Sequence, residues 1–145
     1  RQGKVAAEAA AGLKAAFDPA AIPSVAYTSP EIAWAGLTEK EAKGSGRAYD
    51  KGVFPWAASG RALTGDNASG LTKILFDPDT KRIIGAGIAG HNAGELISEA
   101  VLAMEMGSDA FDIGDTVHPH PTLAETIGFA SEIVSGTVTD LLPKK

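Results

Sequence analysis

The segment 71–90 limits the fold of this chain more than any other stretch of its sequence. Two apolar runs, LTKILF (71–76) and RIIGAGIAG (82–90), flank the connection DPDTK, which places aspartate and proline where turns favour them. Strands joined by so short a connection must run antiparallel, because a parallel pair needs a crossover of roughly a dozen residues or more. The segment therefore predicts an antiparallel hairpin.

The second arm of this hairpin contains GAGIAG (85–90), which matches the G-x-G-x-x-G pattern of dinucleotide-binding proteins. That site needs the first strand of a parallel β-α-β unit and, after its helix, a strand ending in an acidic residue, and this chain offers neither. Ile84, Ala86 and Ile88 alternate with glycines, so we expect the strand to continue through the motif, with close packing on one face. A nucleotide-binding module remains the less favoured alternative.

Periodicity and turn residues place the other elements. One helix has a capping box made by Thr38 and Glu41 and should stop at Gly44, and the longest helix should end at Gly107. Strands in a block followed by helices indicate an α+β fold, with a mainly antiparallel sheet of about five strands and helices packed on one face. We expect helices over 4–16 with a possible end near Gly12, and over 38–44, 93–106 and 121–135. We expect strands over 25–28, 33–37 and 47–56, and a loop over 57–70.

Composition excludes several classes of partner and chemistry. The net charge is −5 and no lysine or arginine cluster is present, so we expect no nucleic-acid binding. No apolar run approaches the ~20 residues of a membrane span, so we expect no membrane insertion. The absence of cysteine excludes disulfides, cysteine-ligated zinc and dithiol redox chemistry within this chain. The chain opens in a helical pattern without an initiator methionine, and we therefore expect a fragment of a longer protein.

The stretch HPHPTLAE (118–125) carries the most suggestive chemistry. His118 and His120 each precede a proline, which favours an extended backbone, and residues two apart in extended chain point to the same side. Two converging imidazoles suit a metal ion, for which Asp115 or His91 would be the candidate third ligand. One interpretation of the stretch is therefore a metal site.

Two other interpretations need no metal. Pro121 suits the first turn of a helix, and Thr122 with Glu125 matches a capping box, in which case Glu125 binds a backbone N–H and the histidines are structural. Alternatively, the Glu125 carboxylate reaches back to His120, fixes its tautomer and stabilises the imidazolium of a general acid/base. The residues alone leave these interpretations open.

At this point the sequence resembles a known family. HPHPTLAE resembles the H-x-H-P-T-L-x-E stretch of dihydrolipoamide dehydrogenases, which belong to the pyridine nucleotide-disulfide oxidoreductases. Five further stretches resemble the C-terminal portion of that family in the same order: IPSVAYTSPEIAWAGLTEKEAK, FPWAASGRAL, GLTKILFD, IIGAGIAG and AGELISEAVLAMEMG. The resemblance implies that residues 21–145 are the interface, or dimerisation, domain and that residues 1–20 are a remnant of the preceding FAD-domain segment.

The resemblance also implies roles for individual residues. In a homodimer, His120 would reach the partner subunit's active site and act as acid/base between dihydrolipoamide and the redox-active disulfide, with Glu125 hydrogen-bonded to it. The backbone of His120 and Pro121 would lie near the partner subunit's FAD. His118 would have a supporting role, and Pro119 departs from the small residue usual between the two histidines.

The same resemblance implies cofactors and partners of the full-length parent. The implied cofactors are FAD and NAD, and the implied partner is the acyltransferase component of a 2-oxoacid dehydrogenase complex. On this chain alone we expect neither cofactor and no metal. The tail TDLLPKK resembles bacterial versions, so we expect a cytoplasmic parent. Without a nucleophile or an electron carrier, this chain alone should be inactive. The alternatives are a stand-alone metal- or nucleotide-binding module and a purely structural interaction domain.

Overall fold

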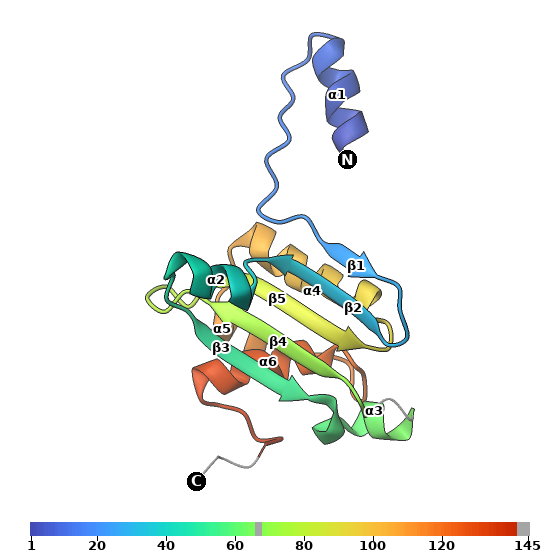
Figure 1. Cartoon of the computed structure of the whole chain (residues 1–145), viewed down its shortest axis with the longest axis vertical. Coiled ribbons are helices and arrows are strands. Elements are labelled where there is room, and N and C mark those ends of the chain that lie inside the picture. Colours follow the sequence, from blue (N-terminus) through green and yellow to red (C-terminus); the bar gives the residue numbers. More distant parts are fainter. Residues whose placement is uncertain (66–67, 142–145) are drawn as a thin grey trace.

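The predicted hairpin lies at the centre of a five-stranded sheet (Figure 1). The computed structural model describes residues 1–65 and 68–141. The strand order is β1-β2-β5-β4-β3, and every neighbouring pair is antiparallel, which confirms the predicted α+β class. The strands are β1 (Ser24–Ala26), β2 (Glu31–Gly36), β3 (Asp50–Pro55), β4 (Leu71–Phe76) and β5 (Ile83–Gly90).

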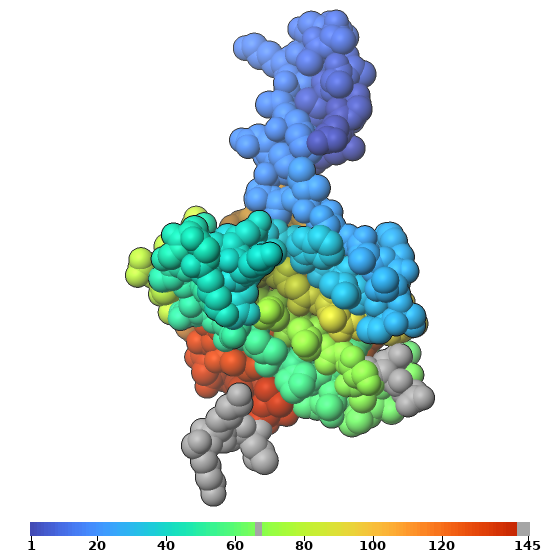
Figure 2. All heavy atoms as spheres, viewed as in Figure 1, coloured from blue at the N-terminus to red at the C-terminus, as the bar shows by residue number. Residues whose placement is uncertain are grey.

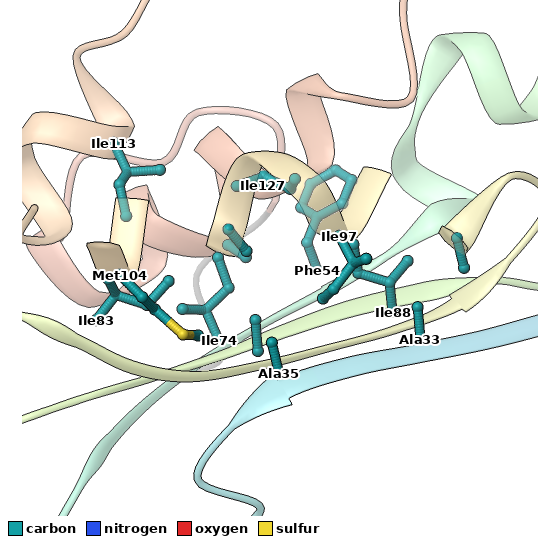
Figure 3. Close-up of a cluster of buried hydrophobic side chains, with 14 of the residues drawn as sticks. Ala33, Ala35, Phe54, Ile74, Ile83, Ile88, Ile97, Met104, Ile113 and Ile127 are labelled. Carbon is teal, nitrogen blue, oxygen red and sulfur yellow. The ribbon is translucent and has the colours of Figure 1, made fainter. Parts of the chain in front are cut away.

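One face of the sheet is covered by two helices, α4 (Ala93–Met106) and α6 (Glu125–Ser135). Helix α4 packs on β2 and β5, whereas α6 packs on β3 and β4 and also against the short helix α5 (Ala110–Gly114). Figure 3 shows side chains of these helices meeting those of the sheet. Burying an isoleucine such as Ile97 or Ile127 contributes about 1.5–3 kcal/mol, so this layer holds the helices to the sheet.

The GAGIAG motif lies entirely within β5, as the alternation predicted. Its residues pair with β2 on one side and with β4 on the other, so β5 is the central strand. The motif therefore forms no loop at a helix N-terminus, which a dinucleotide phosphate would need. The nucleotide-binding alternative therefore loses the sequence motif on which it rested.

Helix α2 (Glu39–Ser45) lies over one end of the opposite face. Its predicted capping box between Thr38 and Glu41 is present. Glu39 binds Lys73 of β4 at 2.8 Å and Lys51 of β3 at 3.0 Å. The hydrogen bonds to these lysines, of which that to Lys73 has the largest effect, hold the pKa of the Glu39 carboxyl well below its usual range. The predicted stop at Gly44 is wrong, because the helix continues and its left-handed cap falls at Gly46, where φ is 69°.

The rest of this face is uncovered, as Figure 2 shows between α2 and the strands β1 and β2. It holds a groove of about 280 Å³ lined mainly by apolar side chains. Trp34, one of its lining residues, is 39% exposed, whereas its neighbours Ala33 and Ala35 on the same strand are buried. The alternation along β2 therefore separates a core face from an open face.

Helix ends differ from the sequence prediction in several places. Helix α1 (Gln2–Ala10) ends just before Gly12, where the sequence offered a possible end, and it buries no residue. It stands away from the sheet (Figure 1). Its end is set locally, because Gly12 has a φ of 79° and the Leu13 backbone N–H donates to the Glu8 carbonyl at 3.0 Å. The expected loop contains two short helices, η1 (Trp56–Ala58) and α3 (Gly60–Thr64), whereas Asp66 and Asn67 lie outside the described residues.

Helix α6 begins at Glu125, not at Pro121 as predicted. Residues 121–124 form an irregular turn, in which Thr126 N–H bonds to the Leu123 carbonyl. Nothing in the described part of the chain forms a helix long and apolar enough to cross a membrane. The tail residues 142–145 lie outside the described residues.

Candidate acid–base site

His120 and Glu125 form a hydrogen-bonded pair in the turn before α6. The His120 Nδ1 and Glu125 Oε1 atoms are 2.8 Å apart. The His120 side chain is 80% exposed, whereas that of Glu125 is only 13% exposed. The imidazole therefore projects into solvent, whereas the carboxylate that binds it lies mostly below the protein surface.

The second carboxylate oxygen of Glu125 accepts a hydrogen bond from the Thr122 backbone N–H at 2.7 Å. This is one half of the predicted capping box. The other half is absent: Thr122 Oγ1 is buried and finds no hydrogen-bond partner within residues 1–65 and 68–141, and α6 has no side-chain cap. Both interpretations of Glu125 are therefore partly right: Oε2 makes the capping hydrogen bond, and Oε1 makes the hydrogen bond to His120.

This arrangement fixes what His120 can do. A carboxylate only accepts hydrogen bonds, so the proton between the two groups sits on His120 Nδ1. In the neutral ring, Nε2 is then the free acceptor, directed away from the carboxylate. If Nε2 takes up a proton, the adjacent carboxylate stabilises the resulting imidazolium. The pair has the geometry of a general acid/base in which Nε2 of the exposed His120 ring exchanges the proton.

His118, two residues earlier, has a different environment. Its Nε2 donates to Glu99 Oε1 of α4 at 2.6 Å, and its side chain is 10% exposed. This hydrogen bond is the main reason that the pKa of His118 is raised above its ordinary value, although burial opposes the shift. The ring also packs on Gly128, where a Cβ atom would lie 3.1 Å from His118 Cε1. His118 thus ties the histidine loop to α4, and its Nε2 is engaged by Glu99.

The metal interpretation finds no third ligand. His118 and His120 are each bonded to a different carboxylate, Glu99 and Glu125, on two different helices. Within the described ranges, no group of three or more His, Asp or Glu side chains is placed to hold a metal ion. The candidate ligands Asp115 and His91 are both exposed.

Sequence reasoning missed Glu99. It lies 19 residues before His118, on a helix whose apolar pattern drew attention to other positions. A signal was nevertheless present. Glu99 follows Leu96 by three residues and precedes Ala103 by four, and both of these are partly buried. A carboxylate on the packed side of an amphipathic helix usually has a partner, since burying an unpaired charge is costly.

Comparison with known proteins identifies the family of this domain. Residues 22–131 match the family model of the pyridine nucleotide-disulphide oxidoreductase dimerisation domain. The chain is 57% identical over 140 residues to dihydrolipoyl dehydrogenase of Vibrio cholerae, covering 97% of this chain and 30% of that protein. It is 55% identical over 140 residues to the Haemophilus influenzae enzyme, covering 97% of this chain and 29% of that protein. The chain therefore spans about a third of the length of these relatives.

Solved structures share the fold. LpdA of Mycobacterium tuberculosis superposes with a TM-score of 0.82 at 23% identity, over 91% of this chain and 29% of that one. The HOCl-induced flavoprotein disulfide reductase RclA of Escherichia coli gives a TM-score of 0.82 at 22% identity, over 90% of this chain and 31% of that one. Identities this low support the fold alone, but the family match and the close relatives go further. This chain belongs to the dimerisation-domain family of the pyridine nucleotide-disulphide oxidoreductases.

Proposed function

We propose that this chain is the dimerisation domain of a dihydrolipoamide dehydrogenase and supplies His120 and Glu125 as an acid/base pair to the partner subunit. One observation carries the proposal: an exposed imidazole is hydrogen-bonded at 2.8 Å to a carboxylate that is mostly buried, with the other ring nitrogen free. Such a pair has a function only if a reacting group is brought to the free nitrogen.

The reacting group has to come from outside this chain. The sequence contains no cysteine, so the chain holds neither a redox-active disulfide nor a thiol nucleophile of its own. We infer that His120 takes a proton from the dithiol of dihydrolipoamide as that dithiol attacks a disulfide of the partner subunit. The proton resides on Nε2, and Glu125 balances the positive charge of the ring.

Exposed apolar residues support a homodimer. Leu102 and Met106 lie one turn apart on α4 and are 62% and 74% exposed. Val117 is 95% exposed and directly precedes His118, whose ring is bonded to the same helix. Large apolar side chains this exposed are typical of a surface that a partner covers. A second copy would cover them and would place His120 at its own surface.

The cofactors FAD and NAD would be held by other parts of the parent. The only G-x-G-x-x-G stretch of the chain is a paired strand, which leaves no phosphate-binding loop on it. The flavin and the nicotinamide would supply the electron transfer. Pro121 is exposed beside His120, and this stretch of backbone is where we expect the partner subunit's flavin to approach.

The boundary and setting of the domain follow from the same proposal. Residues 1–20 would belong to the preceding FAD-domain segment and residues 21–145 to the dimerisation domain. The exposed helix α1, which buries no residue here, is consistent with that division. The parent would be a cytoplasmic bacterial enzyme that works with the acyltransferase component of a 2-oxoacid dehydrogenase complex.

The experiment is a substitution in the full-length parent. His120→Gln should lower turnover of dihydrolipoamide by roughly 10²–10⁴-fold, the usual contribution of general acid–base catalysis. His91→Gln is the matched control, because His91 is the remaining histidine and is also exposed, but lies outside the pair. Turnover near the wild-type rate in the His120 variant would instead support a purely structural interaction domain.

A further inference from the structure

A series of three hydrogen bonds, the first two of them buried, leads from Trp56 to the turn that carries the acid–base pair. Trp56 Nε1–H donates to Thr72 Oγ1 at 3.0 Å. Thr72 Oγ1 and Thr126 Oγ1 are 2.8 Å apart, and Thr126 Oγ1 donates to the Leu123 carbonyl at 2.7 Å. The series therefore joins η1, the sheet strand β4 and the start of α6.

Only one direction of donation satisfies every group in this series. An indole N–H can only donate, so Thr72 accepts from it and has its own proton left for Thr126. A carbonyl can only accept, so the Thr126 proton goes to Leu123. Trp56, Thr72 and Thr126 are each fully buried, with 0% of their surface exposed. No water competes there, and a lost link would leave a buried polar group unsatisfied.

The first donor is held by the packing of its ring. A Cβ atom on Gly70 or on Gly90 would come within 2.3 Å of the Trp56 ring, so both positions exclude any side chain. The Trp56 backbone N–H also bonds to the Gly70 carbonyl at 2.9 Å. Gly90, the last glycine of GAGIAG, is thus explained by the tryptophan packed on it, and Trp56 aims its N–H at Thr72 in one orientation.

The series ends where the acid–base pair begins. Thr126 directly follows Glu125, and the Leu123 carbonyl also accepts the backbone N–H of Thr126 at 3.1 Å. Helix α6 has no side-chain cap at Ala124, so the two hydrogen bonds from Thr126 to the Leu123 carbonyl fix its first turn instead. The direction of the Glu125 carboxylate depends on that turn, because the carboxylate also binds Thr122 N–H within it.

We propose that Trp56, Thr72 and Thr126 are positioning residues that hold the Glu125 carboxylate on His120 Nδ1. Their side-chain hydrogen bonds go to one another and to the Leu123 carbonyl, so they act by fixing the turn from within the core. The consequence for turnover rests on the function proposed above, whereas the consequence for the His120–Glu125 hydrogen bond does not. The FPWAASGRAL stretch, which contains Trp56, thereby gains a role at a site distant in sequence.

The test uses Thr126→Val, which keeps the shape of the side chain but removes its hydroxyl. The first readout is ¹⁵N NMR of the His120 ring in this chain, at a pH where the ring is neutral. Wild type should carry its proton on Nδ1, and Thr126→Val should shift the population towards the Nε2–H tautomer. In the full-length parent, kcat should fall by roughly 10- to 100-fold with KM unchanged, as expected for a misplacement of about 1 Å.

Three further variants decide the outcome. Thr126→Ser restores the hydroxyl and should restore both readouts. Ser131→Ala removes another fully buried hydroxyl of α6, one bonded only within the helix, and should change neither readout. If Thr126→Val does not fold, Thr72→Val breaks the series one residue earlier and is measured in the same way. A wild-type His120 tautomer in a folded but less stable variant would overturn the inference, whatever His120→Gln does to turnover.

Discussion

His118 and His120 lie two residues apart in one loop, each before a proline and each bonded to a glutamate, yet their environments are opposite. His118 is 10% exposed and binds Glu99, which comes from a helix 19 residues earlier. His120 is 80% exposed and binds Glu125, only five residues later. One pair closes a long-range contact, whereas the other is a local pair on the surface.

The difference shows that the role of a histidine–carboxylate pair depends on how exposed the histidine is. The His118–Glu99 pair joins the histidine loop to α4, and removing either partner would leave a largely desolvated group without its hydrogen bond. A pair with one exposed nitrogen contributes little to stability but retains a site for proton transfer. Four substitutions test this contrast, and they are given in order of expected effect on stability.

Removing the partner of the buried histidine should have the largest effect. Glu99→Ala leaves the His118 ring without its main acceptor and should lower the free energy of unfolding by about 1–3 kcal/mol. Urea denaturation of this chain measures the change, with Glu95→Ala, an exposed glutamate of the same helix, as the control. Equal losses in the two variants would contradict the role given to the pair.

The stability that His118 provides should depend on pH. Its folded-state pKa is raised above the unfolded value of ~6.5, so its contribution is complete below about pH 6.5 and disappears as pH rises through the folded pKa. Glu99, Glu125 and the Thr116 backbone all raise this pKa, whereas burial lowers it. The difference in melting temperature between wild type and His118→Gln should therefore be larger near pH 6 than near pH 9. A difference independent of pH would refute the charged pair.

Crowding the buried ring should have a smaller effect. In Gly128→Ala the new Cβ atom would lie 3.1 Å from His118 Cε1 and 3.2 Å from Nδ1, so the ring must shift by a few tenths of an ångström. Alanine favours the helix by up to ~1 kcal/mol over glycine, which offsets part of this cost. NMR should show the His118 ring resonances moving and those of His120 unchanged. Equal movement of both rings would mean that the two pairs are coupled.

Removing the exposed histidine should have the smallest effect on the fold. His120→Gln in this chain should change the free energy of unfolding by no more than ~0.5 kcal/mol, as for most exposed side chains. The same denaturation experiment measures it beside Glu99→Ala. A loss as large as that of Glu99→Ala would show that His120 also has a structural role and would remove the contrast between the two pairs.

The sequence alone was sufficient for features that depend on neighbouring residues. The turn after β4 sets the antiparallel direction of the hairpin, and Thr38 with Glu41 begins α2. The spacing of His120 and Glu125 allowed their hydrogen bond to be proposed as one of three interpretations. Each of these interactions spans only a few residues, so the chain has little freedom to avoid it.

Other features depended on packing between distant segments. The start of α6 moved to Glu125 because the preceding turn is held by the hydrogen bonds that Glu125 and Thr126 make to it. No helix was expected at α5, although Asp109 and Asp112 form a capping box at its start. Propensity proposes such elements, but contacts with the rest of the chain decide where they begin and end.

The sequence by itself determined that the chain folds as an antiparallel α+β domain and that it has no cysteine chemistry, and it made Glu125 one candidate partner of His120. Only the tertiary structure decided which histidine is buried, that Glu99 is its partner, and that Trp56 and Thr72 connect to the turn of the site. The physical reason is that burial and long-range hydrogen bonds exist only after α4, α6 and the sheet have closed on one another.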